Sequence, residues 1–244
     1  MECKMTCSDQ GLVWPLPTGP MVLSKQLVAF PDENGIALRN FATTANVEFL
    51  AKKFFTDVFV DYLIVMRDNR AKKGKDNKDL DLVTVSVEVQ VQEDFSYLTL
   101  ETDETYSLTA SMTTANAIEV VIVAKTYQGM RHGLETLSQL ISWNERLGVF
   151  QMHSSVEITD GPAYAYRGVS VDTSRNFMPV SVLKRMIDGF SYSKLNVFHW
   201  HLSDSQSFPL CLPSLPQLCE YGSYSEKMRL AFALFITYVH SIEF

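Results

Sequence analysis

The chain has 244 residues, of which 46% are hydrophobic and 20% charged, so it can bury a core in one large domain or in two smaller ones. A formal net charge of −7 argues against nucleic acid or an anionic membrane as a partner. No apolar run reaches the roughly 18 residues that span a bilayer, and the first ten residues lack the basic-then-apolar layout of a signal peptide.

The front of the chain predicts a strand followed by a long helix. A proline-rich extended segment at residues 14–20 precedes apolar residues 21–30, which predict the strand. Residues 45–66 are mostly apolar and contain neither glycine nor proline, which predicts the helix. Five basic residues then lie within residues 70–78, beside a glycine and an asparagine. This segment allows a basic binding site or a solvated loop, and its composition favours the loop.

Strict alternation of valine with polar residues begins at Val83 and ends at Gln92. It predicts a strand with one buried and one wet face. Three further strands are predicted at residues 97–101, 106–110 and 117–124, and a helix is predicted at residues 126–143. Residues 1–160 therefore predict an α+β domain with one sheet and with helices packed on one face.

The pattern changes after Gly161-Pro162. Residues 167–172 predict a strand, residues 180–192 a helix with apolar side chains at i, i+3, i+4 and i+7, and residues 195–202 a second strand. Strand, helix and strand with short connections predict a right-handed unit with parallel strands, which we expect to be covered on both faces. An α/β barrel begins in this way.

Two charged side chains follow the carboxyl ends of these strands, where the loops of an α/β barrel build an active site. Arg175 follows the first strand and Asp204 follows the second. Arg175 can donate paired hydrogen bonds to neighbouring hydroxyls of a sugar, or it can pin its own loop to a carboxylate such as Asp172. Asp204 can accept a hydrogen bond from a catalytic histidine, act as a base, or cap its loop. The residues alone leave these alternatives open.

Two histidines, His199 and His201, alternate with Trp200 and therefore project to the same side of the second strand. A metal site is one interpretation. Because the sequence shows no third ligand beside them, we expect two histidines that are satisfied inside a barrel core. We predict neither a metal nor a cofactor.

Three pairs of adjacent acidic residues and four cysteines complete the candidates. The acidic pairs are Asp32-Glu33, Glu93-Asp94 and Asp103-Glu104. All three lie among turn-forming residues, so we expect solvated carboxylates and no catalytic role. The cysteines are Cys3, Cys7, Cys211 and Cys219, too few for a disulfide scaffold. We expect free or buried thiols, although Cys3 or Cys7 can also pair with a cysteine outside this sequence.

Four contiguous motifs resemble family 20 glycoside hydrolases, the β-N-acetylhexosaminidases. Residues 161–177 and 194–209 resemble the start of the family's catalytic (β/α)8 barrel. Residues 127–140 resemble the helix that ends its N-terminal domain, and residues 14–19 resemble its opening. The resemblance extends from about residue 3 to residue 224. It is greatest to the insect enzymes, including the group that trims N-glycans.

The resemblance implies an enzyme that removes terminal β-linked N-acetylglucosamine or N-acetylgalactosamine from glycans or chitooligosaccharides. Configuration is retained, because the substrate's own acetamido oxygen is the nucleophile. In the family an Asp orients the acetamido group and the adjacent Glu protonates the leaving oxygen. Arg175 matches the arginine that grips the hydroxyls of the terminal sugar. Asp204 matches an aspartate that supports a histidine near the acid, and Asp172 matches a structural position at the strand end.

The family's acid pair follows the fourth barrel strand, whereas this sequence predicts two barrel strands. The histidine that Asp204 would support and the aromatic walls of the sugar pocket are also missing. We therefore expect a C-terminally truncated member without activity of its own. Residues 1–160 would form the N-terminal domain, and residues 161–244 the start of the barrel with a divergent tail at residues 226–244.

Two alternatives remain for a chain of this kind: a non-catalytic carbohydrate-binding or interaction fragment that partners full-length subunits, and an N-terminal domain that acts as an autonomous structural module. The resemblance also implies the secretory pathway, the lysosome or the cell surface as the location of the family, and it is compatible with dimerisation of its full-length members.

Overall fold

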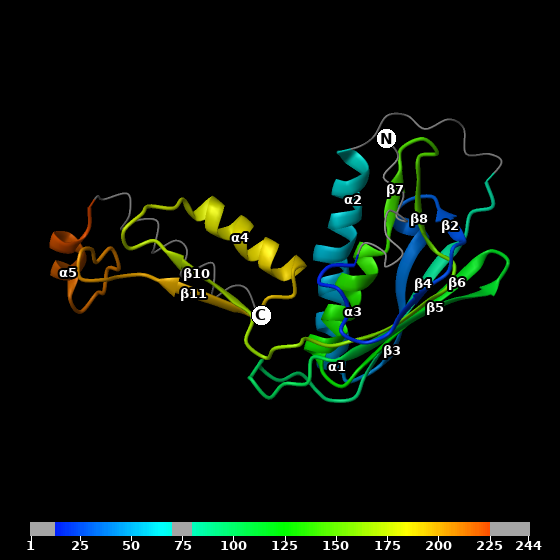
Figure 1. Ribbon diagram of the computed structural model, residues 1–244, viewed down its shortest axis with the longest axis horizontal. Coiled ribbons are helices and arrows are strands. Elements are labelled where there is room, and N and C mark those ends of the chain that lie inside the picture. Colours follow the sequence, from blue (N-terminus) through cyan, green and yellow to red (C-terminus); the bar gives the residue numbers. More distant parts are fainter. Residues whose placement is uncertain (1–12, 70–79, 225–244) are drawn as a thin grey trace. The chain divides into compact units, whose positions relative to one another are not determined.

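The computed structural model describes residues 13–69 and 80–224 (Figure 1). The chain splits into two compact units between Ala165 and Tyr166. The predicted basic loop at residues 70–78, the tail at residues 226–244, Cys3 and Cys7 lie outside the described residues. No helix in the part of the chain that is described is both long and apolar enough to cross a bilayer.

The first unit contains a six-stranded sheet with the strand order β1-β9-β5-β6-β4-β3. The strands are β1 (Met21–Leu23), β3 (Ile36–Ala42), β4 (Thr84–Val91), β5 (Tyr106–Thr114), β6 (Ala117–Ala124) and β9 (Val156–Asp160). β3, β4 and β6 run parallel, and β5, β9 and β1 pair antiparallel. The valines of β4 at positions 85, 87, 89 and 91 are buried, while the side chains between them are half-buried. This confirms the predicted alternation.

A second sheet in this unit corrects the prediction of a single sheet. It is antiparallel, with the order β2-β8-β7. Its strands are β2 (Leu27–Phe30), β7 (Ser142–Asn144) and β8 (Val149–His153). The predicted strand at residues 21–30 is therefore two strands that belong to different sheets, because the chain turns at residues 24–26. There Ser24 donates its N–H to Ser155 O, and Gln26 O accepts from Ser154 N. The strand predicted at residues 97–101 is wrong, since Thr99 and Thr102 form a turn there.

The predicted helix at residues 45–66 is confirmed as a continuous helical segment with a π-helical middle. It consists of α1 (Ala45–Phe54), the π-helical η2 (Phe55–Val60) and α2 (Asp61–Asp68), and a short 3-10 helix, η1 (Glu33–Gly35), precedes β3. Thr44 caps α1 by accepting a hydrogen bond from Val47 N. α3 (Tyr127–Gln139) ends before the predicted limit at residue 143, because residues 142–144 belong to β7. α3 packs over β4, β5 and β6, with α1 beside it (Figure 1).

Two glycines allow α3 to lie close to the sheet. A Cβ atom at Gly133 would lie 2.6 Å from Cγ2 of Ile122, and one at Gly129 would overlap the main-chain oxygen of Thr105. Leu134 and Leu137 of the same helix are fully buried. The core of this unit is therefore packed against helix backbone as well as side chains.

The second unit contains the predicted strand, helix and strand. β10 (Gly168–Asp172) pairs parallel with β11 (Val197–His201), α4 (Val180–Tyr192) connects them, and α5 (Pro216–Gly222) follows. Leu183 and Ile187 of α4 are buried against Val171 of β10. Val171 is, however, the one buried residue of the two strands, and His199 is exposed. The expectation of strands covered on both faces is therefore wrong for the described residues, in which α4 covers one face. α5 was not predicted.

Candidate active site

The parallel register of β10 and β11 brings their carboxyl ends to one edge. Asp172 lies opposite His201, and Thr173 N donates to His201 O at 3.1 Å just beyond the last pair. The loops that start at this point carry Arg175 and Asp204. Nε of Arg175 lies 3.0 Å from Oδ2 of Asp204, so the structure brings together the two residues that the sequence singled out.

Arg175 is also bound to Asp172. Its Nε lies 2.6 Å and its Nη2 2.5 Å from Oδ2 of Asp172, whose Oδ1 accepts the main-chain N–H groups of Ser174 and Arg175. The guanidinium therefore bridges two carboxylates, and the alternative in which Arg175 pins its loop to Asp172 is present in the structure. The side chain of Arg175 is 54% exposed, whereas that of Asp204 is 14% exposed. A fixed but accessible guanidinium can still contact a ligand.

Three small polar residues that sequence reasoning missed tie the first loop to the second loop and to β11. Ser174 donates its hydroxyl to Ser207 O at 2.8 Å, and Trp200 Nε1 donates to Thr173 Oγ1 at 2.7 Å. Thr173, Ser174 and Ser207 are all buried. The available signal was that each loop begins with an Asp followed by a threonine or serine, which is typical of turns closed by a carboxylate. Such turns are common, so the signal does not distinguish these loops from others.

The Asp204 turn is closed by its own side chain. Oδ1 of Asp204 accepts the N–H groups of Gln206 and Ser207 at 2.8 and 3.1 Å, and Asp204 N donates to Ser207 O at 2.9 Å. Nε2 of His201 lies 3.6 Å from the other carboxylate oxygen. Loop capping, one of the alternatives for Asp204, is therefore present, and a histidine also lies beside it.

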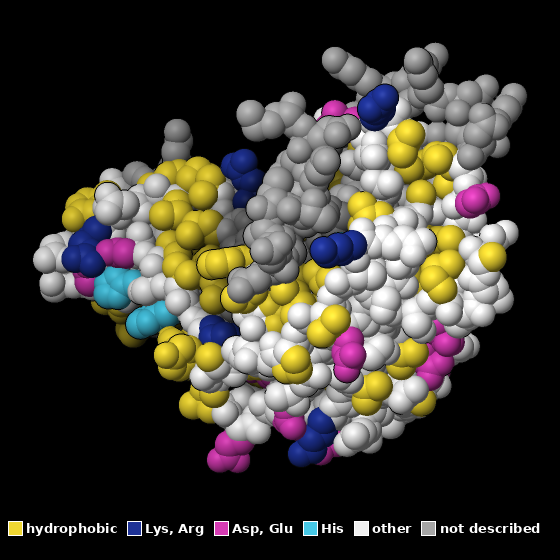
Figure 2. All heavy atoms as spheres, turned by 45° about the vertical axis from the view of Figure 1, so that its right-hand side comes forward, with side chains coloured by type: hydrophobic (Ala, Val, Ile, Leu, Met, Phe, Trp, Pro, Cys, Tyr) yellow, Lys and Arg dark blue, Asp and Glu magenta, His cyan; other side chains and the backbone are white. Residues whose placement is uncertain are grey.

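The two strand histidines are not enclosed in a core, which corrects the expectation for them. His199 is exposed and the side chain of His201 is 37% exposed. Asp172, His201 and Asp204 each offer a ligand atom, all within 4.8 Å of one another, so the assumption that no third ligand lies nearby is also wrong. Arg175 already lies against both carboxylates, and a cation would have to displace it. The absence of a metal stays a prediction. Figure 2 shows histidine, acidic and basic side chains gathered on a small area of this unit.

Both carboxylates are held in the ionised state. Burial alone would raise the pKa of Asp172, but the N–H and guanidinium of Arg175 and the N–H of Ser174 lower it below its ordinary value. Burial alone would raise the pKa of Asp204 as well. The N–H groups of Gln206 and Ser207, His201 and the charge of Arg175 outweigh it, so this pKa is lowered too.

We expect the carboxyl groups of Asp172 and Asp204 to titrate with midpoints below about 3.9, the pKa of an unperturbed Asp. A group whose pKa is depressed by folding stabilises the fold above its unfolded value, and this contribution is lost as the pH falls through the folded value. NMR titration of the carboxyl carbons tests this. Replacing Arg175 by Ala should move both midpoints upward, and midpoints at or above about 3.9 in the unaltered chain would contradict the geometry.

The acidic pairs of the first unit depart from the expected solvated turns. Glu104 is 4% exposed, and its Oε2 lies 2.8 Å from Nε2 of the buried His132. Glu33 forms an ion pair with Arg67. The prediction of a solvated carboxylate is therefore wrong for Glu104 and Glu33, whose partners lie far away in the sequence.

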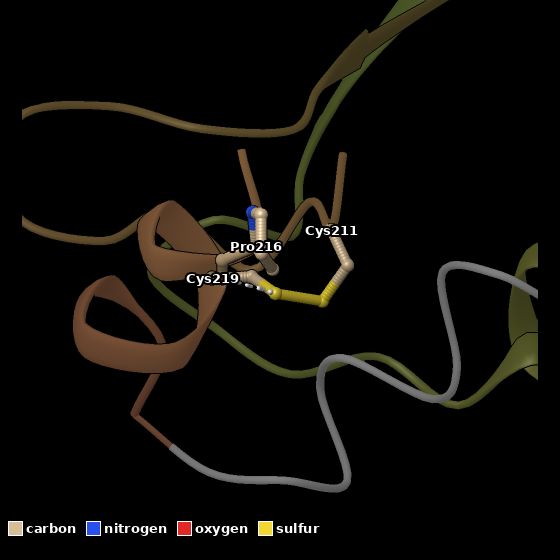
Figure 3. Close-up of a disulfide and its surroundings, with 3 residues drawn as sticks. All are labelled: Cys211, Pro216 and Cys219. Carbon is tan, nitrogen blue, oxygen red and sulfur yellow. Dashed lines mark hydrogen bonds between the residues drawn. A yellow bond between two sulfur atoms is a disulfide. The ribbon is translucent and has the colours of Figure 1, made fainter. Parts of the chain in front are cut away.

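The disulfide between Cys211 and Cys219 corrects the expectation of free thiols for these two residues (Figure 3). Their Cα atoms are 5.0 Å apart, and the bond ties the start of a loop to α5. Sγ of Cys219 lies 3.4 Å from Pro216 O; since a disulfide sulfur carries no hydrogen, this is a contact without a donor. The two cysteines are eight positions apart in the sequence, a spacing that by itself does not specify a pair.

Comparison with known proteins places these features in a family. Residues 13–140 match the family model described as beta-acetyl hexosaminidase like, and residues 164–241 match that of the catalytic domain of glycosyl hydrolase family 20. The chitooligosaccharidolytic β-N-acetylglucosaminidase of Ostrinia furnacalis is 38% identical over 226 residues, which cover 91% of this chain and 36% of the relative. The protein of the same name from Bombyx mori is 35% identical, with the same two coverages.

A solved structure is similar to this chain as well. The chitobiase of Flavobacterium johnsoniae superposes with a TM-score of 0.62 at 26% identity, over 87% of this chain and 30% of the chitobiase. The chain thus spans about a third of the length of the curated relatives it matches.

Proposed function

Because the chain belongs to glycoside hydrolase family 20, a family of enzymes, we propose that it contributes the part of a β-N-acetylhexosaminidase site that holds the terminal sugar. The substrates would be chitooligosaccharides or glycans that end in β-linked N-acetylglucosamine or N-acetylgalactosamine. The observation that carries the proposal is the accessible Arg175, fixed between Asp172 and Asp204 at the carboxyl ends of two parallel strands.

Arg175 would grip the hydroxyls of the terminal sugar. A guanidinium has five N–H donors, and the two carboxylates engage Nε and Nη2. The guanidinium is fixed through these two nitrogens, so its other N–H donors can bind neighbouring hydroxyls without a large loss of side-chain entropy. The lowered pKa values of Asp172 and Asp204 keep this anchor ionised to a lower pH than two ordinary Asp carboxylates would allow.

Asp204 would act as a positioning residue that does not touch the sugar. Two N–H groups of its own turn and the guanidinium of Arg175 fix its carboxylate. A carboxylate held in this way can orient a neighbouring imidazole and stabilise its charged form, which is the part the family gives to this position.

We also propose that these 244 residues do not hydrolyse glycosides by themselves. The family's reaction needs an Asp that orients the acetamido group and an adjacent Glu that protonates the leaving oxygen. The three adjacent acidic pairs of the sequence all precede residue 105, and none follows β10 or β11. In this proposal residues 1–160 are the N-terminal domain, and β10, α4 and β11 are the first elements of a barrel that the 244 residues leave incomplete.

A hybrid enzyme tests the proposed role of Arg175. Residues 13–224 replace the matching part of the Ostrinia furnacalis relative, and hydrolysis of para-nitrophenyl N-acetyl-β-glucosaminide is measured. We expect Arg175→Ala to lower kcat/KM about 30-fold, the size expected for a lost hydrogen bond from a charged group.

Arg185→Ala is the matched control, because Arg185 is an exposed arginine of α4 whose Nε donates to Ser181 O. It should change kcat/KM less than about twofold. If both variants leave kcat/KM unchanged while the hybrid is active and folded, Arg175 does not bind the sugar and the proposal fails.

A further inference from the structure

The Cys211–Cys219 disulfide closes a short loop at the start of α5 (Figure 3). The loop contains a turn in which Leu215 N donates to Leu212 O at 3.0 Å. Cys219 is buried, whereas Cys211 lies at the surface. The bond therefore has one sulfur-bearing residue that solvent can reach and one that is anchored in the unit.

Little apolar burial holds α5 in place. Leu215 is 52% and Tyr221 81% exposed, and Cys219 is the one buried residue of the helix. A helix of seven residues is too short to be stable alone in water. The covalent bond and a few main-chain hydrogen bonds must therefore supply most of its order.

The same segment is hydrogen-bonded to Phe208, the residue that follows the Asp204 turn. Phe208 N donates to Gly222 O at 2.7 Å, at the end of α5. Its neighbour Ser207 donates to Asp204 Oδ1 at 3.1 Å and accepts the hydroxyl of Ser174 through its carbonyl. Two adjacent residues, Ser207 and Phe208, therefore connect α5 to the turn that fixes Asp204.

We propose that the Cys211–Cys219 disulfide is a reducible clamp on the Asp204 turn. A thiolate of a dithiol attacks Sγ of Cys211, the S–S bond breaks, and Cys219 leaves as a thiolate that takes up a proton from water. The second thiolate of the dithiol then attacks the mixed disulfide, releases Cys211, and leaves the dithiol oxidised to its own disulfide. Reduction frees α5 and loosens the turn. The consequence for sugar recognition rests on the proposed function, but the loss of order does not.

Hydrogen exchange followed by mass spectrometry tests the clamp in the full chain with Cys3→Ser and Cys7→Ser, in which Cys211 and Cys219 are the remaining cysteines. On adding dithiothreitol, amides of residues 208–222 should exchange about 30-fold faster, the size expected when a short disulfide loop opens. Residues 203–207 should also exchange several-fold faster, and β4 and β6 should not change.

The Cys211→Ser/Cys219→Ser variant is the control for effects of the reagent. It should exchange at the fast rate with and without dithiothreitol. Equal exchange in the oxidised and reduced chain would overturn the clamp, and so would acceleration confined to residues 208–222. Neither readout needs a sugar or turnover, so a failure here is distinguishable from a failure of the proposed function.

Discussion

Replacing His132 by Leu is expected to destabilise the first unit by about 1–3 kcal/mol, the cost of leaving a buried polar group without one of its hydrogen bonds. Nε2 of His132 lies 2.8 Å from the carboxylate of Glu104, and both residues are 4% exposed. Urea unfolding, followed by the fluorescence of the unit, measures the change.

The double variant Glu104→Leu/His132→Leu provides the control, because it removes both polar groups together. Replacing both partners of a buried pair by apolar residues is often close to neutral, so the double variant should be more stable than His132→Leu alone. If the double variant loses as much free energy of unfolding as the two single variants together, the two residues stabilise the unit independently.

Gly129→Ala is expected to destabilise the first unit by about 3 kcal/mol, at the upper end of the cost of overpacking. Helix propensity alone predicts the opposite sign, because alanine favours a helix interior by about 1 kcal/mol over glycine. The clash decides the outcome, since the added Cβ would overlap the main-chain oxygen of Thr105, which a side-chain rotation cannot relieve. Urea unfolding again measures the difference.

Gly189→Ala in α4 is the matched control. A Cβ atom added there meets nothing within 4 Å, so the propensity gain of about 0.5–1 kcal/mol should appear undiminished. If Gly129→Ala is also stabilising, α3 does not approach the sheet as closely as described.

Local patterns predicted the elements whose signal lies within one segment. The alternation in β4 marks a half-buried strand, and the i, i+3, i+4, i+7 spacing in α4 marks a helix that covers one sheet face. The meeting of Arg175 with Asp204 could also be predicted, because parallel strands place the loops that follow them at a common edge.

Features that depend on distant partners could not be predicted. β2 joins the second sheet through pairing with β8, more than 100 residues away, and the polar residues 24–26 mark a break without showing which sheet each strand joins. Glu104 has a turn-like neighbourhood in the sequence, and its burial depends on His132 of α3. The disulfide likewise depends on α5, whose seven residues carry too weak a helical signal to be recognised.

The site shows the same division. Sequence reasoning identified its charged residues, but it missed the buried serines and Thr173, which join the loops across β10 and β11. It also placed His201 in a core, because it assumed strands covered on both faces. In the described residues one strand face remains half-exposed, and His201 lies beside Asp204 instead.

The most direct test of the central claim is hydrolysis of para-nitrophenyl N-acetyl-β-glucosaminide by the purified 244-residue chain, measured beside the hybrid enzyme. The chain holds the proposed sugar clamp but no acid pair on the unit that carries it. We predict release of para-nitrophenol at the enzyme-free rate by the chain and rapid release by the hybrid. Release by the chain above that rate, abolished by Arg175→Ala, would contradict the account.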